Sequence, residues 1–508
     1  MKLHPLSLPY RAVTRGVSVA STLLFAGLAL GGAVGFLDPF RVVALAAAGL
    51  LAAAAYESAY YRRFGYDLTE NSLDIESGVL SRRRREIPLR RIQNVDIRRN
   101  VVQRAAGIAA VSLETAGGGE TEASLRFVSY EEAKRLQGDI RRRKRRAAAE
   151  ESAAGAETTE ATASEVERPA SGVEPGEPAA VVEPEPEEEE LYAIRSSELV
   201  LLSAISVEPR VAGLAVFVVP LLTRGGAGVD ALVGLAQLAF SGLVLWVASA
   251  MVTFARYYDF RLTRVGDELR YERGLLQRYD GTVPLDKVQT LTLKENPLMR
   301  ATGYASLAIE TAGYAPGQGG DGSEAAIPIA SRERVLSLAR EVESFEDLDF
   351  QRPPKRARRR YAARYALVAG ALTAGAYALH WYTDAFELWY AVAALVVLAP
   401  VAAHYRWKHR GYSAGADHVV TRNGFWRRAT VVVPYYRVQT VVQQATVFQR
   451  RLWLATVVVD TASSARLAGQ DARAADFDAA TAAELRELVA ERLQADLRER
   501  RAAEKAGE

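Results

Sequence analysis

The chain has 508 residues, a formal net charge of +3 and no cysteine. The lack of cysteine excludes disulfide frameworks and thiolate metal sites, and five scattered histidines argue against a histidine metal site. The small net charge conceals strong segregation, because apolar blocks alternate with blocks rich in Arg and Glu. The sequence therefore predicts no metal and no cofactor.

Six apolar segments occur in three pairs. About 20 apolar residues span the hydrocarbon core of a bilayer, and the connections within each pair are too short to hold a domain. Buried helices of a soluble protein are the alternative for every segment, and a signal peptide is the alternative for the first. Long charge-free runs in matched pairs favour three transmembrane hairpins, formed by residues 17–36 and 40–61, 211–222 and 231–254, and 362–381 and 385–404.

Basic residues flank the outer ends of the hairpins. Arg11 and Arg15 precede the first hairpin, residues 352–360 precede the third, and Arg406 and Arg410 follow it. Since cytoplasmic flanks carry the excess of Lys and Arg, we expect a multi-pass protein of the cytoplasmic membrane. Both termini and all regions between hairpins are then cytoplasmic.

Residues 147–190 consist mainly of Ala, Glu, Pro, Thr and Ser. This composition cannot bury a core, so we predict an acidic disordered linker. A solvated spacer is favoured over an acidic tether that competes for basic faces.

One motif recurs behind each hairpin in a single register. A Gly precedes a Pro by 10 residues, a Gln follows the Pro by 5, an Arg by 16 and a Thr by 27. Agreement at so many fixed offsets indicates three copies of one domain. The repeated residues are Gly78, Pro88, Gln93, Arg104 and Thr115, then Gly274, Pro284, Gln289, Arg300 and Thr311, then Gly424, Pro434, Gln439, Arg450 and Thr461.

Each copy has the pattern of β structure closed by a helix. A short strand ends at the turn Gly, the Pro is predicted just inside the next strand, and a later strand precedes the helix. Capping boxes at Ser129–Glu132 and Thr481–Glu484 predict where two of the helices begin, and Ser331 begins the third without a box. A small β-barrel or split sandwich with a C-terminal helix is therefore expected in each copy.

The fold class is thus a mixed membrane protein with six transmembrane α-helices in three hairpins, each followed by such a domain. The predicted boundaries are hairpin 1 at 1–61, domain 1 at 62–146, the linker at 147–190, hairpin 2 at 191–255, domain 2 at 256–350, hairpin 3 at 351–405 and domain 3 at 406–500.

The motif resembles the bacterial pleckstrin-homology-like (PH-like) domains of the YdbT/YdbS type, formerly a domain of unknown function. In copy one the residues that carry the resemblance are Ile87-Pro88, Arg91-Ile92-Gln93, Gln103-Arg104, Gly107 and Thr115-Ala116-Gly117. Copy three departs from the pattern, with Trp453 and Ser463 at two glycine positions. The resemblance implies a PH-like barrel in each copy and no enzymatic activity, because the family has no established biochemical role.

The repeated polar residues allow two interpretations each. The Gln of each copy is either a shared binding contact or, as favoured here, an amide that satisfies backbone groups near the Pro. The repeated Arg either holds lipid phosphate or, as favoured, caps a helix or pairs with the acids Glu114, Glu310 and Asp460. Copy one alone carries Arg82, Arg83, Arg84 and Arg85, which suit a generic contact with anionic lipid.

The sequence contains no Gly-x-Ser-x-Gly, no phosphate loop and no His-Glu-x-x-His, so no enzyme is predicted. We expect a non-enzymatic membrane scaffold whose cytoplasmic domains bind a protein partner or each other and lie against the inner leaflet. Family resemblance suggests envelope maintenance or stress tolerance as its setting. The alternatives are a transporter or export component, and specific phospholipid-headgroup binding. Expected partners are the lipid bilayer and an unknown protein, with a paired membrane protein of the same family as a candidate, and no nucleic acid.

Overall fold

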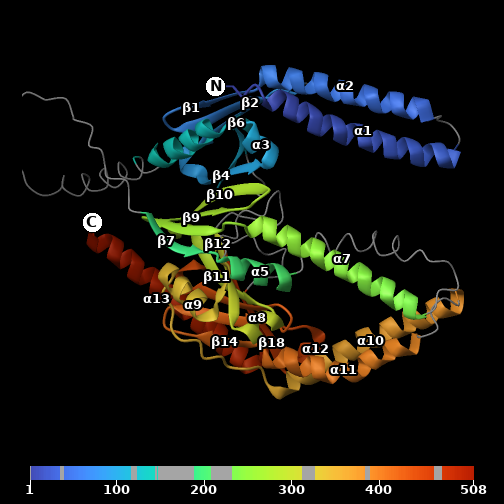
Figure 1. Cartoon of the computed structure of the whole chain (residues 1–508). Coiled ribbons are helices and arrows are strands. Elements are labelled where there is room, and N and C mark those ends of the chain that lie inside the picture. Colours follow the sequence, from blue (N-terminus) through green and yellow to red (C-terminus); the bar gives the residue numbers. More distant parts are fainter. Residues whose placement is uncertain are drawn as a thin grey trace, which may run out of the picture. The chain divides into compact units, whose positions relative to one another are not determined.

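A computed structural model of the chain describes residues 2–34, 39–79, 81–115, 123–143, 146, 188–206, 231–311, 327–383, 389–462 and 472–507 (Figure 1). The chain forms two compact units. Unit 1 comprises Met1–Pro186 together with Leu276–Thr282, and unit 2 comprises Glu187–Leu275 and Val283–Gly507. Copy one of the repeat thus lies in unit 1, while copy three and most of copy two lie in unit 2.

Unit 1 begins with the predicted helical hairpin. Helices α1 (Ser7–Val34) and α2 (Pro39–Arg63) pack side by side along their length (Figure 1). The strands β1, β2 and β3 form a first sheet, and β4, β5 and β6 belong to a second, so the domain is a split sandwich. The elements are β1 (Gly65–Leu68), β2 (Ser72–Ser77), β3 (Arg83–Pro88), the 3-10 turn η1 (Leu89–Arg91), β4 (Ile92–Asn100), α3 (Val101–Ala105), β5 (Ile108–Thr115), β6 (Ala123–Ser129) and a helix over residues 130–143.

The core of unit 1 follows from the alternation of these strands. Leu73 from the first sheet and Ile97, Val111 and Leu113 from the second point inward and are buried. Ile140 of the closing helix completes the cluster. Burying this apolar face holds the two sheets and the helix together.

Unit 2 contains two further copies with the same element order. Copy two has β8 (Arg261–Val265), β9 (Glu268–Arg273), β10 (Gln277–Pro284), η2 (Leu285–Lys287), β11 (Val288–Glu295), α8 (Pro297–Thr302), β12 (Tyr304–Thr311), β13 (Ile327–Ser331) and α9 (Arg332–Val342). Copy three has β14 (Gly411–Ala414), β15 (His418–Asn423), β16 (Arg428–Pro434), η3 (Tyr435–Arg437), β17 (Val438–Gln444), α12 (Val447–Arg450), β18 (Leu454–Thr461), β19 (Ala472–Asp478) and α13 (Ala479–Gly507).

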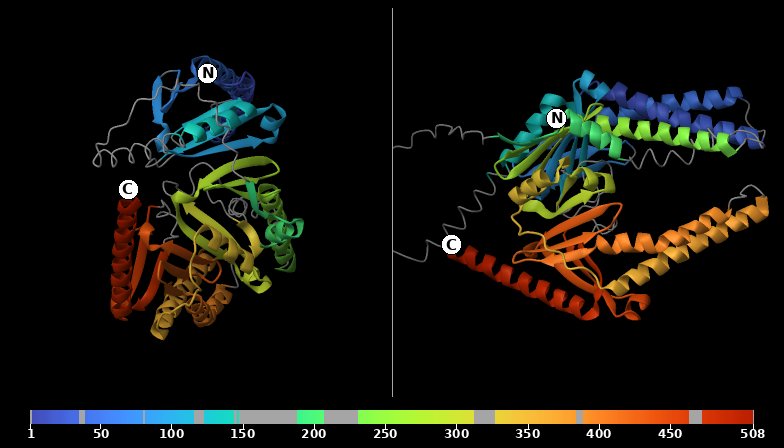
Figure 2. Two further views of the ribbon diagram at one scale, coloured as in Figure 1. Left: turned by 90° about the vertical axis from the view of Figure 1, so that its left-hand side faces the viewer. Right: turned by 60° about the horizontal axis from the view of Figure 1, so that its bottom comes forward.

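Helices precede each copy in unit 2 as well. Copy two follows the strand β7 (Glu188–Ala193), α5 (Ser196–Ile205) and α7 (Ala231–Tyr257), and β7 pairs antiparallel with β8. Copy three follows α10 (Lys355–Thr383) and α11 (Trp389–Lys408), which pack along each other. Figure 2 shows α13 lying along the strands of copy three, where it packs on β17, β18 and β19.

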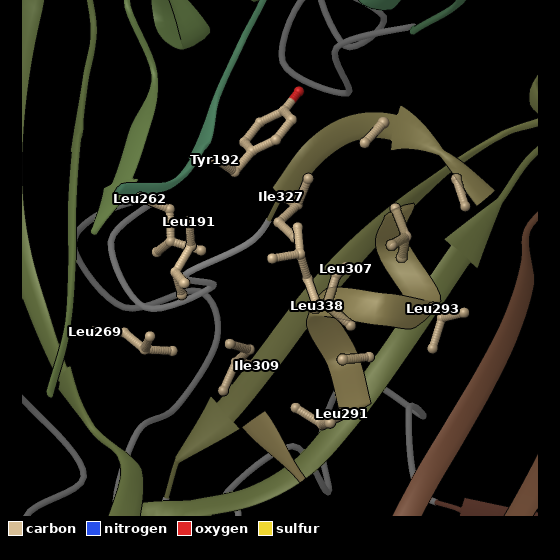
Figure 3. Close-up of a cluster of buried hydrophobic side chains, with 14 of the residues drawn as sticks. Leu191, Tyr192, Leu262, Leu269, Leu291, Leu293, Leu307, Ile309, Ile327 and Leu338 are labelled. Carbon is tan, nitrogen blue, oxygen red and sulfur yellow. The ribbon is translucent and has the colours of Figure 1, made fainter. Parts of the chain in front are cut away.

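A six-stranded sheet crosses from copy two to copy three inside unit 2. Its order is β13-β12-β11-β16-β15-β14, so β11 of copy two pairs with β16 of copy three. The core of copy two, including Leu291, Leu293, Leu307 and Ile309 (Figure 3), also contains Val432 from β16. The two copies therefore share both a sheet and a hydrophobic core.

The turn glycines have the backbone conformation that their position predicts. Gly78, Gly274 and Gly424 have φ of 115°, 107° and 95°. A Cβ atom at Gly424 would lie 2.1 Å from the carbonyl oxygen of Arg427, and one at Gly78 would lie 1.9 Å from that of Ser81. Only glycine fits these turns without rearrangement.

Three local predictions need correction. Pro88, Pro284 and Pro434 end their strands and precede a 3-10 turn, because a residue without an N–H suits the end of a ladder. Helix α13 begins at Ala479, so Thr481 lies inside it and its capping box does not form the helix start. The predicted linker ends earlier than residue 190, since Glu188–Ala193 forms β7.

Two helices among the described residues are long and apolar enough to cross a membrane by themselves, Phe40–Arg63 and Ala239–Tyr257. Helices α1, α10 and α11 are the other long helices of the predicted hairpins. Residues 211–222 lie outside the described residues, as do 147–187 of the linker and the motif residues Ala116, Gly117 and Ser463.

Candidate functional site

In each copy, the end nearest the preceding helices is called here the hairpin end. It consists of the glycine turn and of the short helix (α3, α8 or α12) that follows the second-sheet strand, which is β4, β11 or β17. Gly274 donates its backbone N–H to the carbonyl of Tyr258, just after α7 (2.8 Å), and Leu275 donates to that of Ala255 in the last turn of α7 (2.7 Å). In copy one, Asn100 Nδ2 donates to the hydroxyl of Tyr10 on α1 (2.6 Å). In copy three, Arg356 of α10 donates to the carbonyl of Trp453 (3.2 Å). The turn and the short helix thus lie beside the helices that precede the copy.

This end exposes large apolar side chains in all three copies. In copy three, Trp426 in the turn and Phe448 in α12 are 74% and 68% exposed. The other copies expose aliphatic residues at the same elements, namely Val101, Val102, Leu276 and Leu298. Exposed aromatic and aliphatic side chains beside apolar helices are typical of a surface that contacts the membrane interface.

The short helices contain capping interactions that the motif did not reveal. Asn100 and Thr446 each accept a hydrogen bond from the backbone of the Gln three residues later, and that Gln accepts one in return. Asn296 caps α8 through the backbone of Met299. The Asn-x-x-Gln and Thr-x-x-Gln spacing is a capping-box signal, so the sequence contained the information.

The repeated Gln is the second residue of the second-sheet strand in every copy. Gln289 is buried, and its Nε2 donates to the backbone carbonyl of Lys287 at 3.4 Å. Gln439, at the same position in copy three, is exposed. The backbone of Gln93 lies in β4. Gln289 thus contacts a backbone carbonyl near the Pro in copy two, while Gln439 is exposed in copy three.

The repeated Arg differs in surroundings between copies. In α8, Arg300 donates to the carbonyl of Phe425 at 2.8 Å and its guanidinium lies 5.2 Å from the ring centroid of that residue. Burial and the nearby Arg428 lower its pKa. Arg300 thus holds the glycine turn of the following copy, a role that the sequence did not predict. Arg104 and Arg450 lie in α3 and α12, and the acid Glu310 accepts a hydrogen bond from Thr290.

The repeated Thr ends a strand of the second sheet. Thr115 and Thr461 are buried at the ends of β5 and β18, and Thr311 ends β12. These three threonines pair in register with the first residue of the preceding second-sheet strand, for example Thr311 with Val288. Their position is that of a structural residue.

The four-arginine run occupies the outer strand of the first sheet in copy one. Arg83, Arg84 and Arg85 lie in β3, and Arg82 immediately precedes it. Arg84 is 3.7 Å from Asp74 and 3.6 Å from Glu76 on the neighbouring strand β2, and its side chain is largely exposed. The run is therefore a basic strand edge that is partly balanced by acids beside it.

Copies pair with one another through the same two strands and in the same register. Within unit 1, residues of β10 pair with β4, so that Arg99 lies opposite Arg278. Within unit 2, β11 pairs with β16, so that Glu295 lies opposite Arg428. In both pairings the residue eleven positions after one Pro meets the residue six positions before the next Pro. The pairing is thus a property of the repeat.

A buried ion pair surrounded by further bases lies at the junction between copies two and three. Buried Glu295 receives two hydrogen bonds from Arg428, at 2.8 and 2.7 Å. Arg422 beside it has a pKa lowered to about 10, first by burial and then by Arg428 and other bases. The ring of His409 packs against that of Phe425, and its pKa is lowered to about 4, first by burial and then by Arg300, Arg428, Arg422 and Lys408. The junction therefore concentrates positive charge around one carboxylate.

The second-sheet strand of copy three has no strand on its outer side within the described part of the chain. The order of its sheet is β17-β18-β19, so β17 is an edge. The residues of β11, which is covered by β16, are nearly all buried, whereas those of β17 are mostly exposed. Val442, for example, is 43% exposed, while its counterpart Thr292 is fully buried. In copies one and two this edge, that of β4 or β11, pairs with a strand of the next copy. The equivalent edge of copy three, that of β17, is therefore open within the described residues.

These features define a class of membrane-associated protein with tandem PH-like domains. The family model described as Bacterial PH domain matches residues 21–144, 214–345 and 366–493. The chain belongs to this family and carries three copies of its domain, each match including the preceding helices.

A curated relative supports the same assignment. The transmembrane protein YdbT of Bacillus subtilis (strain 168) is 25% identical over 425 residues, which cover 80% of this chain and 81% of YdbT. No solved structure matches the chain significantly. The resemblance to the YdbT/YdbS type that the sequence indicated is confirmed.

Proposed function

We propose that the chain is a non-enzymatic membrane scaffold whose bacterial PH copies bind other bacterial PH copies edge to edge. The observation that supports this role is the open edge of β17, because the equivalent edges of β4 and β11 each carry a strand of the following copy. An unpaired row of backbone N–H and C=O groups is a template for strand addition. Envelope maintenance or stress tolerance, suggested by family resemblance, is the setting we propose.

The partner we propose is a second copy of this chain, which would offer its β3. In the register of the internal pairings, Gln443 of one chain would lie opposite Arg84 of the next, just as Leu293 lies opposite Thr430. Strand β17 carries no charged residue, so it meets the basic strand without like-charge repulsion. Two β3 edges would place arginines against arginines, which disfavours pairing between identical edges.

The scaffold role includes anchoring by six membrane-spanning helices with both termini and all three domains in the cytoplasm. Supporting this proposal are the two helices that pass the length and hydropathy test, the transmembrane description of YdbT and the basic flanks of the hairpins. The exposed Trp426 and Phe448 would enter the interface of the inner leaflet. The domains would then lie against the membrane.

The proposal can be tested by disulfide crosslinking, since the chain has no native cysteine. A chain with Gln443→Cys would be co-expressed with a chain with Arg84→Cys, and the membranes would be oxidised. We expect a disulfide-linked dimer from the mixed pair and none from either variant alone, because the pairing is head to tail.

The matched control replaces Gln443→Cys by Glu487→Cys, an exposed position on α13. A dimer from the control pair at the same yield, or a dimer from Gln443→Cys alone, would contradict the proposed register. If no dimer forms, a photoreactive residue at Gln443 would show whether another bacterial PH protein occupies the edge. Absence of both products would refute the edge-pairing role.

A further inference from the structure

A basic cavity lies in unit 2 where the ends of α10 and α11 meet the barrel of copy three. Its volume is about 410 Å³. Five arginines line it, two from α10, two from the end of α11 and its following residues, and one from β19: Arg360, Arg364, Arg406, Arg410 and Arg473. Asp476 is the single carboxylate among the lining residues. The cavity therefore has a large excess of positive charge.

The lining of this cavity includes the buried carboxylate of Asp476, and both of its oxygens accept hydrogen bonds. Asp476 accepts hydrogen bonds from Arg410 (2.7 Å), from the hydroxyl of Tyr361 (2.7 Å) and from Gln449 Nε2 (2.8 Å), and it also pairs with Arg360. Its side chain is only 3% exposed, and its backbone φ is 64°. One carboxylate neutralises one of the five guanidinium groups, and Arg406 donates to a neutral hydroxyl, that of Tyr365.

The other copies have buried apolar residues at the positions of this ion pair. One backbone hydrogen bond recurs in all three copies and shows which residues of these strands are equivalent. The residue after β6, β13 or β19 donates its N–H to the carbonyl of the residue before β5, β12 or β18. At the position of Asp476, copy one has Phe127 and copy two has Ile329, both buried.

The partner position shows the same exchange. Counting back from the turn glycine, Arg410 corresponds to Phe64 in copy one and to Phe260 in copy two, and both phenylalanines are buried. Since buried apolar residues occupy both positions in the other two copies, the fold does not require a buried ion pair here. Burying charges usually costs stability relative to apolar residues of similar size. The ion pair of copy three therefore needs an explanation other than folding.

We propose that this cavity binds a phosphate-bearing anion. Guanidinium groups match phosphate oxygens in geometry and remain charged at all physiological pH values. The cavity is large enough for a phosphate group with a small substituent, and Asp476 fixes Arg360 and Arg410 in place so that little ordering is required on binding. A lipid headgroup and free phosphate share this chemistry, and the position of the cavity beside the end of hairpin 3 gives access to either.

The test uses the purified full chain in a nonionic detergent at constant ionic strength. The probes are inorganic phosphate, dihexanoyl phosphatidic acid and dihexanoyl phosphatidylcholine, and the readout is the midpoint of thermal unfolding followed by tryptophan fluorescence. A rise with phosphate alone assigns a free-anion site, a rise with phosphatidic acid alone assigns a headgroup site, and a rise with both assigns the phosphate group itself. No rise with either anion overturns the proposal, as does an equal rise with the zwitterionic lipid.

Variants separate a built site from diffuse charge. Arg364→Gln removes an exposed cavity arginine and should weaken binding roughly tenfold, the effect of one charge-assisted hydrogen bond. Arg359→Gln, on the same helix but outside this cavity, is the matched control and should leave the affinity unchanged. Equal weakening by both variants would show diffuse attraction and overturn the site.

A double variant tests the buried pair. Arg410→Phe with Asp476→Ile installs the side chains of copy two, Phe260 and Ile329, so copy three should stay folded, with an unfolding midpoint at or above that of the parent chain. Anion binding should be lost. Retained binding in this folded variant would overturn the proposal.

Discussion

Three equivalent residues, Gly107, Gly303 and Trp453, share one backbone conformation although their side chains differ. All three are left-handed, with φ of 67°, 77° and 53°, and each follows the short helix of its copy. A non-glycine residue in this region costs about 1 kcal/mol or more. Trp453 carries that cost while its carbonyl accepts hydrogen bonds from Arg356 and Ala479. The backbone conformation is thus a property of the repeat even where glycine is not.

The turn glycine of copy one gives a residue-scale prediction. Gly78→Ala should destabilise the β2–β3 turn by about 1–3 kcal/mol, because its φ of 115° and the nearby Ser81 carbonyl leave no room for a Cβ atom. Hydrogen exchange of peptides from β2 and β3 in the full chain would measure the change. Gly138→Ala, in the closing helix with open space around it, is the control and should be neutral or stabilising. Equal effects of the two substitutions would contradict the steric argument.

His409 gives a pH-dependent prediction. Its pKa in the folded chain is about 4, against an ordinary value of 6.5. Burial lowers the pKa most, and repulsion from nearby cations lowers it further, namely from Arg300, Arg428, Arg422 and Lys408. The unfolded chain therefore binds the proton more tightly, and stability falls as the pH drops from about 6.5 towards 4. We expect this group to cost about 1 kcal/mol by pH 5, reduced from the full linkage by solvent screening.

His409→Gln should remove that part of the acid sensitivity. Urea unfolding of the full chain, followed by tryptophan fluorescence at pH 7 and pH 5, would measure the difference. The variant should lose less stability between the two pH values than the parent. An unchanged pH dependence would show that other groups account for the acid sensitivity.

At the scale of elements, the same strand behaves differently according to its neighbour. The residues of β11 are buried because β16 lies beside them, and those of β17 are exposed because the described part of the chain places nothing there. Both strands have an apolar–polar pattern that closes a core on one face. Whether this strand is buried or exposed therefore depends on whether a strand of a following copy pairs with it.

The junction between β11 and β16 gives an element-scale prediction. Glu295→Ala should cost about 3–5 kcal/mol, since it leaves the largely buried guanidinium of Arg428 without its carboxylate. The urea midpoint of the full chain would report the loss. Asp286→Ala is the matched control in the same copy, because its pair with Lys287 is largely exposed and should contribute about 0–1 kcal/mol. A similar small loss in both variants would show that the junction does not depend on the ion pair.

At the scale of the whole molecule, the proposed membrane topology can be tested directly. The cysteine-free sequence permits single-cysteine mapping with an impermeant maleimide applied to intact cells. Phe40→Cys, in the first turn of α2, should react from outside, whereas Glu487→Cys on α13 should react only after the membrane is opened. This follows from the basic flanks of the hairpins. The reverse labelling would contradict the proposed orientation of both termini.

The repeat, its turn glycines and the class of domain were predictable from the sequence alone, because they depend on fixed spacing and on local backbone conformation. The spacing placed Gly78, Gly274 and Gly424 at turns and predicted strands followed by a closing helix in each copy. Three features became visible only in the folded chain: copies two and three each add a strand to the copy before them, Arg300 holds the turn of the following copy, and Asp476 replaces a buried apolar residue. Local periodicity shows which face of a strand is buried, but the partner at its edge is chosen by contacts between residues far apart in the chain.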